Sequence, residues 1–302
     1  MEWLILLLLV PAVVVPVVGL WGFAGCDFHP TVVPSPPANL HAVAKSDQRI
    51  DLNWEQGDPN TISYRIDRAP DGGTPVTIAD NVTVTTFVDD NIVVNGMGLI
   101  PNTTYFYDVR TIVADSSLTD LADPAKANAK TFALAFQIDP ALPPLDHHDT
   151  GNFCYAQRIP AAQLLADGSK LRLQVWGSPA GNVTVHRIYI SRVANPGNPN
   201  DYQSAGDIKP VLISDLTLPN DQPIFLPDLS NDPIDYTLDQ TMDLIIALDF
   251  TATAAQGNSR HVDQPLVDLH WKPGVQQAAG PRDANYVLQS NRLDFVTKVI
   301  VS

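Results

Sequence analysis

Residues 99–109 read LIPNTTYFYDV, and this stretch decides the fold of the first half of the chain. Successive side chains of an extended strand point to opposite faces of a sheet. The spacing therefore places Tyr105, Tyr107, Val109 and, further along, Val113 on one face. The pattern predicts a β-strand over residues 104–113 with one buried face.

Two upstream stretches show the same period of two, and their shared faces carry Ile50, Leu52, Trp54, Tyr64 and Ile66. Turn-forming sequences separate the predicted strands: Gly57-Asp58-Pro59-Asn60, Asp71-Gly72-Gly73 and Asn95-Gly96. No segment of this region has a helical period. About seven short strands in about 95 residues are typical of a β-sandwich.

The same residues resemble a known family. Residues 99–109 match the pattern Leu-x-Pro-x-Thr-x-Tyr-x-aromatic-x-Val of fibronectin type III domains at every marked position, and three further matches precede them: Pro37-Ala38-Asn39-Leu40, Trp54 and Tyr64-Arg65-Ile66. The resemblance implies that Tyr105 is the tyrosine-corner residue, with its ring in the core and its hydroxyl bonded to nearby backbone. It also implies a spacer or interaction module without a catalytic centre.

The remainder of the chain also predicts strands. The candidates are residues 170–176, 183–191, 210–214, 242–250 and 293–301, and residues 160–166 could form a helical turn. Met242, Leu244, Ile246, Leu248 and Phe250 share one face, with Asp243 and Asp249 on the other. Long polar loops over residues 194–207 and 218–236 connect the strands, and such loops commonly carry binding. A jelly-roll-like sandwich fits this pattern.

Four phrases of this second region, residues 168–173, 185–191, 200–202 and 238–250, resemble a β-sandwich module of bacteriophage tail and accessory proteins and of bacterial surface proteins. That module carries no agreed catalytic residues, so the resemblance implies a structural or recognition role and no specific chemistry.

The N-terminal residues are of a different kind. Residues 3–21 contain no charge and are long enough for a membrane span or for the apolar part of an export signal. Phe23-Ala24-Gly25-Cys26 resembles a lipobox, which implies that Cys26 is a candidate lipid attachment site. Two alternatives stay open: a membrane anchor, or a retained segment packed inside an assembly.

The predicted organisation of the chain is an all-β fold of two tandem β-sandwiches after an N-terminal apolar segment. It consists of an apolar anchor or signal-like segment over 1–26, a proline-rich linker over 27–36, a fibronectin type III-like domain over 37–133 and a jelly-roll-like domain over 134–302.

Composition excludes several function classes. The chain has 18 Lys and Arg against 33 Asp and Glu, a net charge of −15, which a nucleic-acid backbone would repel. Two cysteines are too few for a disulfide-rich scaffold or a zinc site made of cysteines alone. No nucleophile elbow, phosphate loop or dinucleotide fingerprint occurs. We therefore predict a protein that is not an enzyme and that carries no cofactor and no metal.

Several polar groups are candidate metal or catalytic sites. The pairs His261/Asp263 and Asp268/His270, and the run 146–149 (Asp-His-His-Asp), are predicted to be solvated loop residues. Acidic residues over 228–235 could offer oxygen ligands to calcium but lack the spacing of a helix–loop–helix site. Cys154 is predicted to be a small buried residue.

Sugar binding is the function for which the sequence offers specific candidate residues. Tyr202 lies in a polar loop, Trp271 lies in a predicted turn, and Trp176 lies on the strand face opposite the apolar residues of 170–176. Exposed aromatic rings beside Asp, Asn and Gln are what a sugar requires. The alternative reading of each ring is a core or isolated surface aromatic.

These expectations combine into one function. We predict a non-enzymatic structural or host-recognition component of a tailed-phage particle, extracellular and homo-oligomeric, whose partners are other virion or cell-surface proteins and a surface glycan. The alternative is a membrane-anchored bacterial surface lipoprotein with the same two sandwiches, and a third class is an extracellular polysaccharide hydrolase.

Overall fold

The computed structural model describes residues 34–114, 123–147, 151–178, 183–252, 259–274 and 277–302. The apolar segment 3–21 and Cys26 therefore lie outside the described residues. Within the described ranges, no helix is long and apolar enough to cross a membrane.

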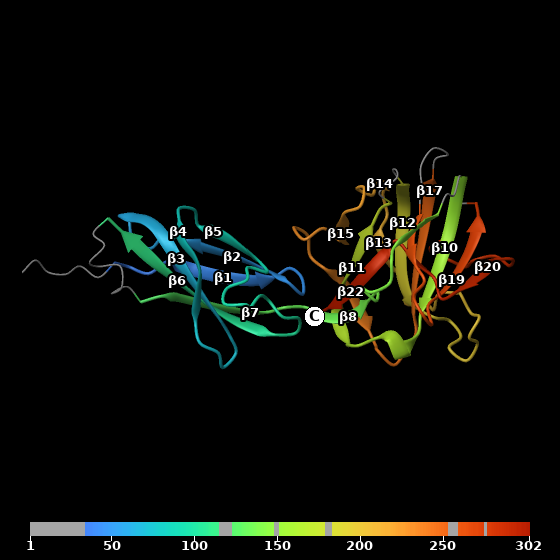
Figure 1. The fold of residues 1–302 in the computed structure, drawn as a ribbon, viewed down its shortest axis with the longest axis horizontal. Coiled ribbons are helices and arrows are strands. Elements are labelled where there is room, and N and C mark those ends of the chain that lie inside the picture. The colour runs from blue at the N-terminus through green and yellow to red at the C-terminus, as the bar shows by residue number, and fades with distance from the viewer. Residues whose placement is uncertain (1–33, 115–122, 148–150, 179–182, 253–258, 275–276) are drawn as a thin grey trace, which may run out of the picture. The chain divides into compact units, whose positions relative to one another are not determined.

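The first sandwich has two antiparallel sheets (Figure 1). The three-stranded sheet consists, in spatial order, of β1 (Ala38–Ala44), β2 (Arg49–Glu55) and β5 (Thr86–Asp90). The four-stranded sheet consists of β4 (Val76–Val82), β3 (Thr61–Pro70), β6 (Thr104–Val113) and β7 (Ala125–Lys130). These seven strands confirm the predicted sandwich.

The predicted inward faces form the core between these sheets. Ile50, Leu52, Trp54, Tyr64, Ile66, Tyr105, Tyr107, Val109 and Val113 are all buried. The rings of Trp54 and Tyr64 meet edge to face, with centroids 5.1 Å apart. The period-two pattern therefore identified both the strands and their buried faces.

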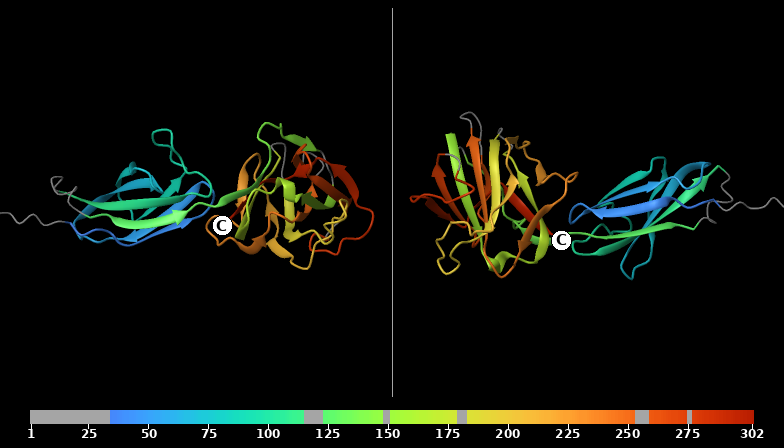
Figure 2. Two further views of the ribbon diagram at one scale, coloured as in Figure 1. Left: turned by 90° about the horizontal axis from the view of Figure 1, so that it is seen from below. Right: turned by 180° about the vertical axis from the view of Figure 1, so that it is seen from behind.

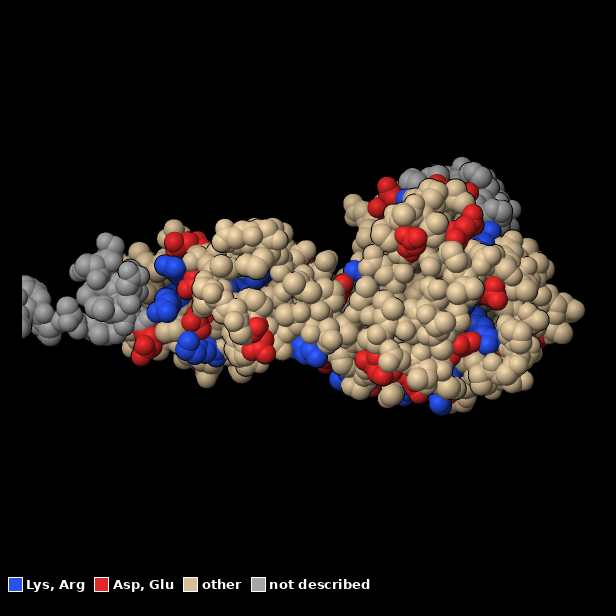
Figure 3. Space-filling view, turned by 60° about the horizontal axis from the view of Figure 1, so that its bottom comes forward, with Lys and Arg blue, Asp and Glu red and all other residues tan. Residues whose placement is uncertain are grey.

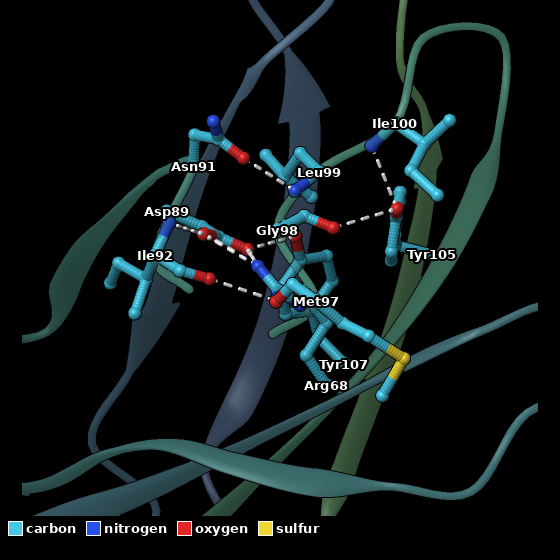
Figure 4. Close-up of polar contacts among 10 residues, drawn as sticks. All are labelled: Arg68, Asp89, Asn91, Ile92, Met97, Gly98, Leu99, Ile100, Tyr105 and Tyr107. Atoms are coloured by element: carbon cyan, nitrogen blue, oxygen red, sulfur yellow. Dashed lines mark hydrogen bonds and ion pairs between the residues drawn. The ribbon is translucent and has the colours of Figure 1, made fainter. Parts of the chain in front are cut away.

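The tyrosine corner is confirmed in detail (Figure 4). The Tyr105 hydroxyl donates to the carbonyl oxygen of Gly98 at 3.2 Å and accepts from the backbone N–H of Ile100 at 2.8 Å. The ring itself is 2% exposed. One side chain thus fills the core and fixes the turn that leads into β6.

A buried ion pair, which the sequence pattern did not predict, lies in the same core (Figure 4). Arg68 donates to both carboxylate oxygens of Asp89, at 2.9 and 2.8 Å, and to the carbonyl oxygens of Ile92 and Met97 at 3.0 Å each. The Tyr107 hydroxyl donates to Asp89 at 2.8 Å. Burial, together with the charge of Asp89, raises the pKa of Tyr107. The cluster joins the two sheets and holds the segment that follows β5.

The second sandwich is larger (Figure 1, Figure 2). Its seven-stranded sheet consists of β13 (Lys209–Leu212), β12 (Val183–Arg192), β17 (Leu244–Ala252), β10 (Gly151–Ile159), β19 (Asp268–Pro273) and β20 (Val287–Ser290), with β14 (Leu216–Thr217) also on β12. Its five-stranded sheet consists of β15 (Pro223–Leu226), β11 (Gly168–Trp176), β22 (Val296–Val301) and β8 (Ala133–Gln137), with β16 (Ile234–Leu238) also on β11. A small third sheet consists of β21 (Leu293–Asp294), β18 (Ser259–Val262) and β9 (Leu145–His147).

All five strand regions predicted here are found, and a 3₁₀ turn, η2 (Ala161–Gln163), lies in the predicted helical stretch. The loop predicted over 218–236 is wrong in part, because it contains β15 and the start of β16. The fold is thus an all-β jelly-roll-like sandwich after a fibronectin-like one.

Strand β17 explains why a simple alternating pattern is incomplete in this domain. Leu244, Ile246, Leu248 and Phe250 face the core between the sheets, as predicted. Asp249 lies on the other face but is only 1% exposed, because that face is covered as well. A strand that is buried on both sides reads as a nearly continuous apolar run.

Candidate functional site

The outer face of the seven-stranded sheet carries a second, small core. Its buried members are Cys154, Ala156, Val193, Ile245, Ala247 and Ala278. Half-buried Tyr189, Tyr202 and Tyr286 pack against it. Two long loops, residues 194–208 and 277–286, supply several of these side chains. We call this region the loop-covered face.

Arg282 links the two loops of the loop-covered face. Its guanidinium donates to the carbonyl oxygens of Tyr202 at 2.6 Å and Ala278 at 2.7 Å, and to the Ser204 hydroxyl at 3.2 Å. Burial lowers its pKa, and nearby Asp249 opposes that shift. Asp249 in turn accepts from the backbone N–H groups of Gln277 and Ala278, at 3.2 Å each. The two loops are thus ordered by hydrogen bonds to charged side chains, whereas strands are ordered by backbone hydrogen bonds to neighbouring strands.

Arg158 and Asp243 hold the other end of the 194–208 loop. Arg158 donates to Asp243 at 2.7 Å and to the carbonyl oxygen of Asn198 at 2.5 Å. Asp243 also accepts from the backbone N–H of Ala161, the first residue of η2, at 2.8 Å. This pair is 7% and 17% exposed, so screening by solvent is limited.

Arg172 performs the same task on the five-stranded sheet. From β11 it donates to the carbonyl oxygens of Pro227, Asp228 and Asn231, at 2.7, 3.0 and 2.5 Å. Asp228 itself caps the turn by accepting from both the N–H and the hydroxyl of Ser230. The acidic loop 228–235 is therefore ordered by an arginine and by its own turn.

Tyr202, the first predicted sugar contact, lies on the loop-covered face. Its ring stacks on Tyr286 with centroids 4.8 Å apart and lies 4.9 Å from the ring of His270. Its hydroxyl donates to the carbonyl oxygen of Asp283 at 3.0 Å. In this structure Tyr202 serves to attach one loop to the other.

Trp271 and Trp176 lie elsewhere. The turn predicted around Trp271 is wrong, because Trp271 lies within β19. It follows His270 on that strand, so it points to the opposite face of the sheet, where it lies 6.1 Å from the ring of Phe153. Trp176 is half-buried, and the guanidinium carbon of Arg260 lies 4.2 Å from its ring centre. The structure therefore does not bring Tyr202 and Trp271 into one sugar site, and sugar contact by each ring remains a prediction. Cys26, the predicted lipid attachment site, lies outside the described residues.

The polar candidates have environments that the sequence did not predict. His261 and His270 are 8% and 2% exposed and lie on β18 and β19, so the expectation of solvated loop histidines is wrong for both. Burial lowers the pKa of His270. Over the described ranges, no group of three His, Cys, Asp or Glu side chains lies close enough to hold a metal ion.

Cys154 is buried, as predicted, at 2% exposure. Burial is the largest cause that raises the pKa of its thiol, to about 12, and nearby Asp249 adds to the shift. A nucleophilic cysteine needs a lowered pKa, so this environment favours an unreactive thiol.

A polar chain that the sequence did not reveal lies at the edge of the same face. A β-bulge in β12 turns His186 outward; its Nδ1 donates to Asp215 at 2.8 Å, and its Nε2 lies 2.6 Å from the Thr251 hydroxyl. The order carboxylate, imidazole, hydroxyl is that of a Ser-His-Asp catalytic triad. Asp215 is 71% exposed, however, and Thr251 also bonds to Asn152, so the chain ties a loop to the sheet.

Comparison with family models yields a match for the first sandwich. Residues 35–124 match the family model of the fibronectin type III domain. Among solved structures, the chain is similar to an Fn3-like protein from Clostridium thermocellum (26% identity, 33% of this chain and 93% of that chain, TM-score 0.25) and to the FN5 domain of Drosophila Lar (24%, 33% and 97%, 0.26). It is also similar to the FN1-FN3 domains of chicken CNTN1 (9%, 88% and 99%, 0.27). No curated protein matches the chain.

The fold defines an all-β protein that contains two β-sandwiches. Its residues 35–124 match the fibronectin type III family model and contain the tyrosine corner that the motif at residues 99–109 implied. Domains of this family are typically non-catalytic.

Proposed function

We propose that the chain is a non-enzymatic recognition and structural protein on the surface of a tailed-phage particle, with its second sandwich presenting fixed loops to a partner. The observation that carries this proposal is the anchoring of three loops by buried Arg158, Arg172 and Arg282, each bonded to loop carbonyl oxygens. Loops ordered before binding lose less conformational entropy when a partner docks. Residues 238–250 and three other segments resemble phage tail modules, and this resemblance supports the assignment of the protein to a phage particle.

The surface is compatible with this role. Figure 3 shows acidic and basic side chains beside one another, between broad uncharged areas. The net charge of −15 favours partners that are neutral or basic over nucleic acid. Homo-oligomerisation and an extracellular location are part of the same proposal, because weak contacts to a host surface gain strength through repeated copies.

Mass spectrometry of purified phage particles and of cell envelopes from the producing bacterium tests the proposal. We expect the chain in the particles at a stoichiometry similar to that of other structural proteins. Its absence from particles would overturn the phage assignment. A chain that is found instead in the envelope, begins at Cys26 and carries acyl groups would establish the lipoprotein alternative, which Phe23-Ala24-Gly25-Cys26 favours.

A further inference from the structure

An exposed aromatic ring lies at the floor of a hollow in the first sandwich, where the sequence had indicated no site. Phe106 is on β6 between buried Tyr105 and Tyr107, so it points away from the core. It is 43% exposed. In the four-stranded sheet its direct neighbours are Ala69 on β3 and Asn128 on β7. The small Ala69 side chain leaves room beside the ring.

The turn after β3 forms one wall of the hollow. Gly73 donates its N–H to the carbonyl oxygen of Pro70 at 2.8 Å, and Gly72 has a φ of +70°, which closes a tight turn. A Cβ on Gly73 would lie 2.6 Å from Pro70, so this close approach requires glycine. With Pro75 the turn borders an open hollow of about 470 Å³, which Phe106 also lines.

The rim is polar, but its charges are already paired. Asp108 lies opposite Lys126 and accepts from it at 3.1 Å. Asp67, directly opposite Asp108 on β3, accepts from Arg65 at 3.1 Å and from the Thr77 hydroxyl at 2.6 Å. Within the described part of the chain, the Asn128 side-chain amide makes no hydrogen bond and is exposed. The rim therefore offers donors and acceptors without a net charge to neutralise.

We propose that this hollow binds one ring of a neutral sugar, stacked on Phe106. The C–H face of a pyranose is complementary to an exposed aromatic face, and its hydroxyl groups both donate and accept. Asn128 can do both, Asp108 accepts and Lys126 donates. An anionic sugar is disfavoured, because the rim has no unpaired cation and the chain carries −15. The hollow is open and carries one ring, so affinity per site is in the millimolar range, about 1–10 mM.

Saturation-transfer NMR on the full chain tests this assignment. The probes are methyl glucoside, methyl galactoside and N-acetylglucosamine, each at about 20 mM, with glucuronate as the anionic counterpart. We expect saturation transfer to at least one neutral probe and much less to glucuronate. Absence of transfer to every neutral probe would overturn the proposal.

Variants locate the contact. Phe106→Ala should weaken binding about five- to tenfold, and Phe106→Trp should retain it. Ile62→Ala is the matched control, because Ile62 is an exposed apolar residue (55%) of β3 outside the hollow. Unchanged binding in Phe106→Ala, or an equal loss in Ile62→Ala, would contradict the site. Calorimetric melting of each variant separates a binding defect from unfolding.

This inference rests on the proposed recognition function, but the two can fail separately. If the chain is a particle component and no sugar binds, only the Phe106 site is wrong. If sugar binds at Phe106 but the chain is absent from particles, the recognition chemistry stands and the particle assignment is wrong.

Discussion

Arg68 and Asp89 lie in the core of the first sandwich with side chains 2% and 0% exposed. Removing one partner of such a pair leaves an uncompensated charge in a medium that cannot solvate it. We predict that Asp89→Asn lowers the stability of the first sandwich by about 3–5 kcal/mol. Differential scanning calorimetry of the full chain should show one transition shifted strongly to lower temperature.

The control for Asp89→Asn is Asp51→Asn, because Asp51 pairs with Arg49 at 2.7 Å on the surface. Both side chains there are more than a quarter exposed, so the change should cost about 0–1 kcal/mol. Equal effects of the two substitutions would show that the buried pair has no special role.

Cys154 provides a prediction about alkaline pH. Its folded pKa of about 12 lies above the value of 9.0 for a free thiol, so the folded state keeps the proton to higher pH than the unfolded state. The protonated thiol therefore contributes fully to the free energy of unfolding below pH 9, and this contribution is lost as pH rises toward the folded pKa. In a Cys26→Ser background, stability should fall above about pH 9 by up to about 1.4 kcal/mol per pH unit more than in Cys154→Ala. Parallel urea-unfolding profiles of the two proteins would refute this.

At the residue scale, the sequence predicted contacts between residues that lie close together in the chain. Tyr105 was assigned correctly because its motif is short and its bonds go to backbone within seven residues. The Arg68–Asp89 pair joins residues 21 apart, and Arg282 bonds to a loop 80 residues away. No period or spacing encodes such partners, so the sequence analysis did not identify these buried arginines.

At the scale of elements, loops are held by single side chains. Arg172→Met would leave the carbonyl oxygens of Pro227, Asp228 and Asn231 without their donor. We predict a loss of about 2–3 kcal/mol in the second sandwich, measured by urea unfolding. Lys170 lies on the same strand as Arg172 and forms an exposed ion pair with Asp235. Lys170→Met removes this pair and should leave stability unchanged. If both variants behave alike, Arg172 does not order this loop.

The aromatic stack of the loop-covered face predicts a response to mild acid. Burial lowers the pKa of His270, with Arg158 and Arg282 adding to the effect and Asp268 and Asp201 opposing it. The neutral form therefore stabilises the fold at and above the unfolded pKa of 6.5, and that stability is lost as pH falls through the lower folded pKa.

Between about pH 7 and pH 5, the second sandwich should consequently lose stability in the natural chain but lose less in His270→Gln. Urea unfolding of both proteins at pH 7 and at pH 5 measures the change in stability. A His270→Gln variant as sensitive to acid as the natural chain would contradict the assignment.

Strand β10, which the sequence analysis did not predict, is covered on both faces. β10 contains Gln157 and Arg158, which interrupt its apolar run, yet seven of its nine residues are buried. The loops of the loop-covered face supply the second cover, and they come from segments far along the chain. A strand that depends on such distant cover cannot be recognised from its own alternation.

At the scale of the whole molecule, buried arginines that bond to loop carbonyl oxygens occur in both sandwiches. The chain has only 18 Lys and Arg, and several of them lie inside the sandwiches, where they bond to backbone carbonyl oxygens of loops. Buried arginines fix loop geometry through many donors at once, whereas a flexible loop would have to be ordered by its partner. Sequence composition gives the net charge of −15 but does not reveal this internal use of the cations.

Hydrogen–deuterium exchange of the full chain, read by mass spectrometry, tests most directly whether these loops are ordered before any partner binds. The account predicts that amides in 194–208, 227–231 and 277–286 exchange much more slowly than those of an unstructured chain, and that Arg282→Met releases the first and third segments while leaving 227–231 protected. Exchange at the unprotected rate in all three segments of the natural chain would contradict it.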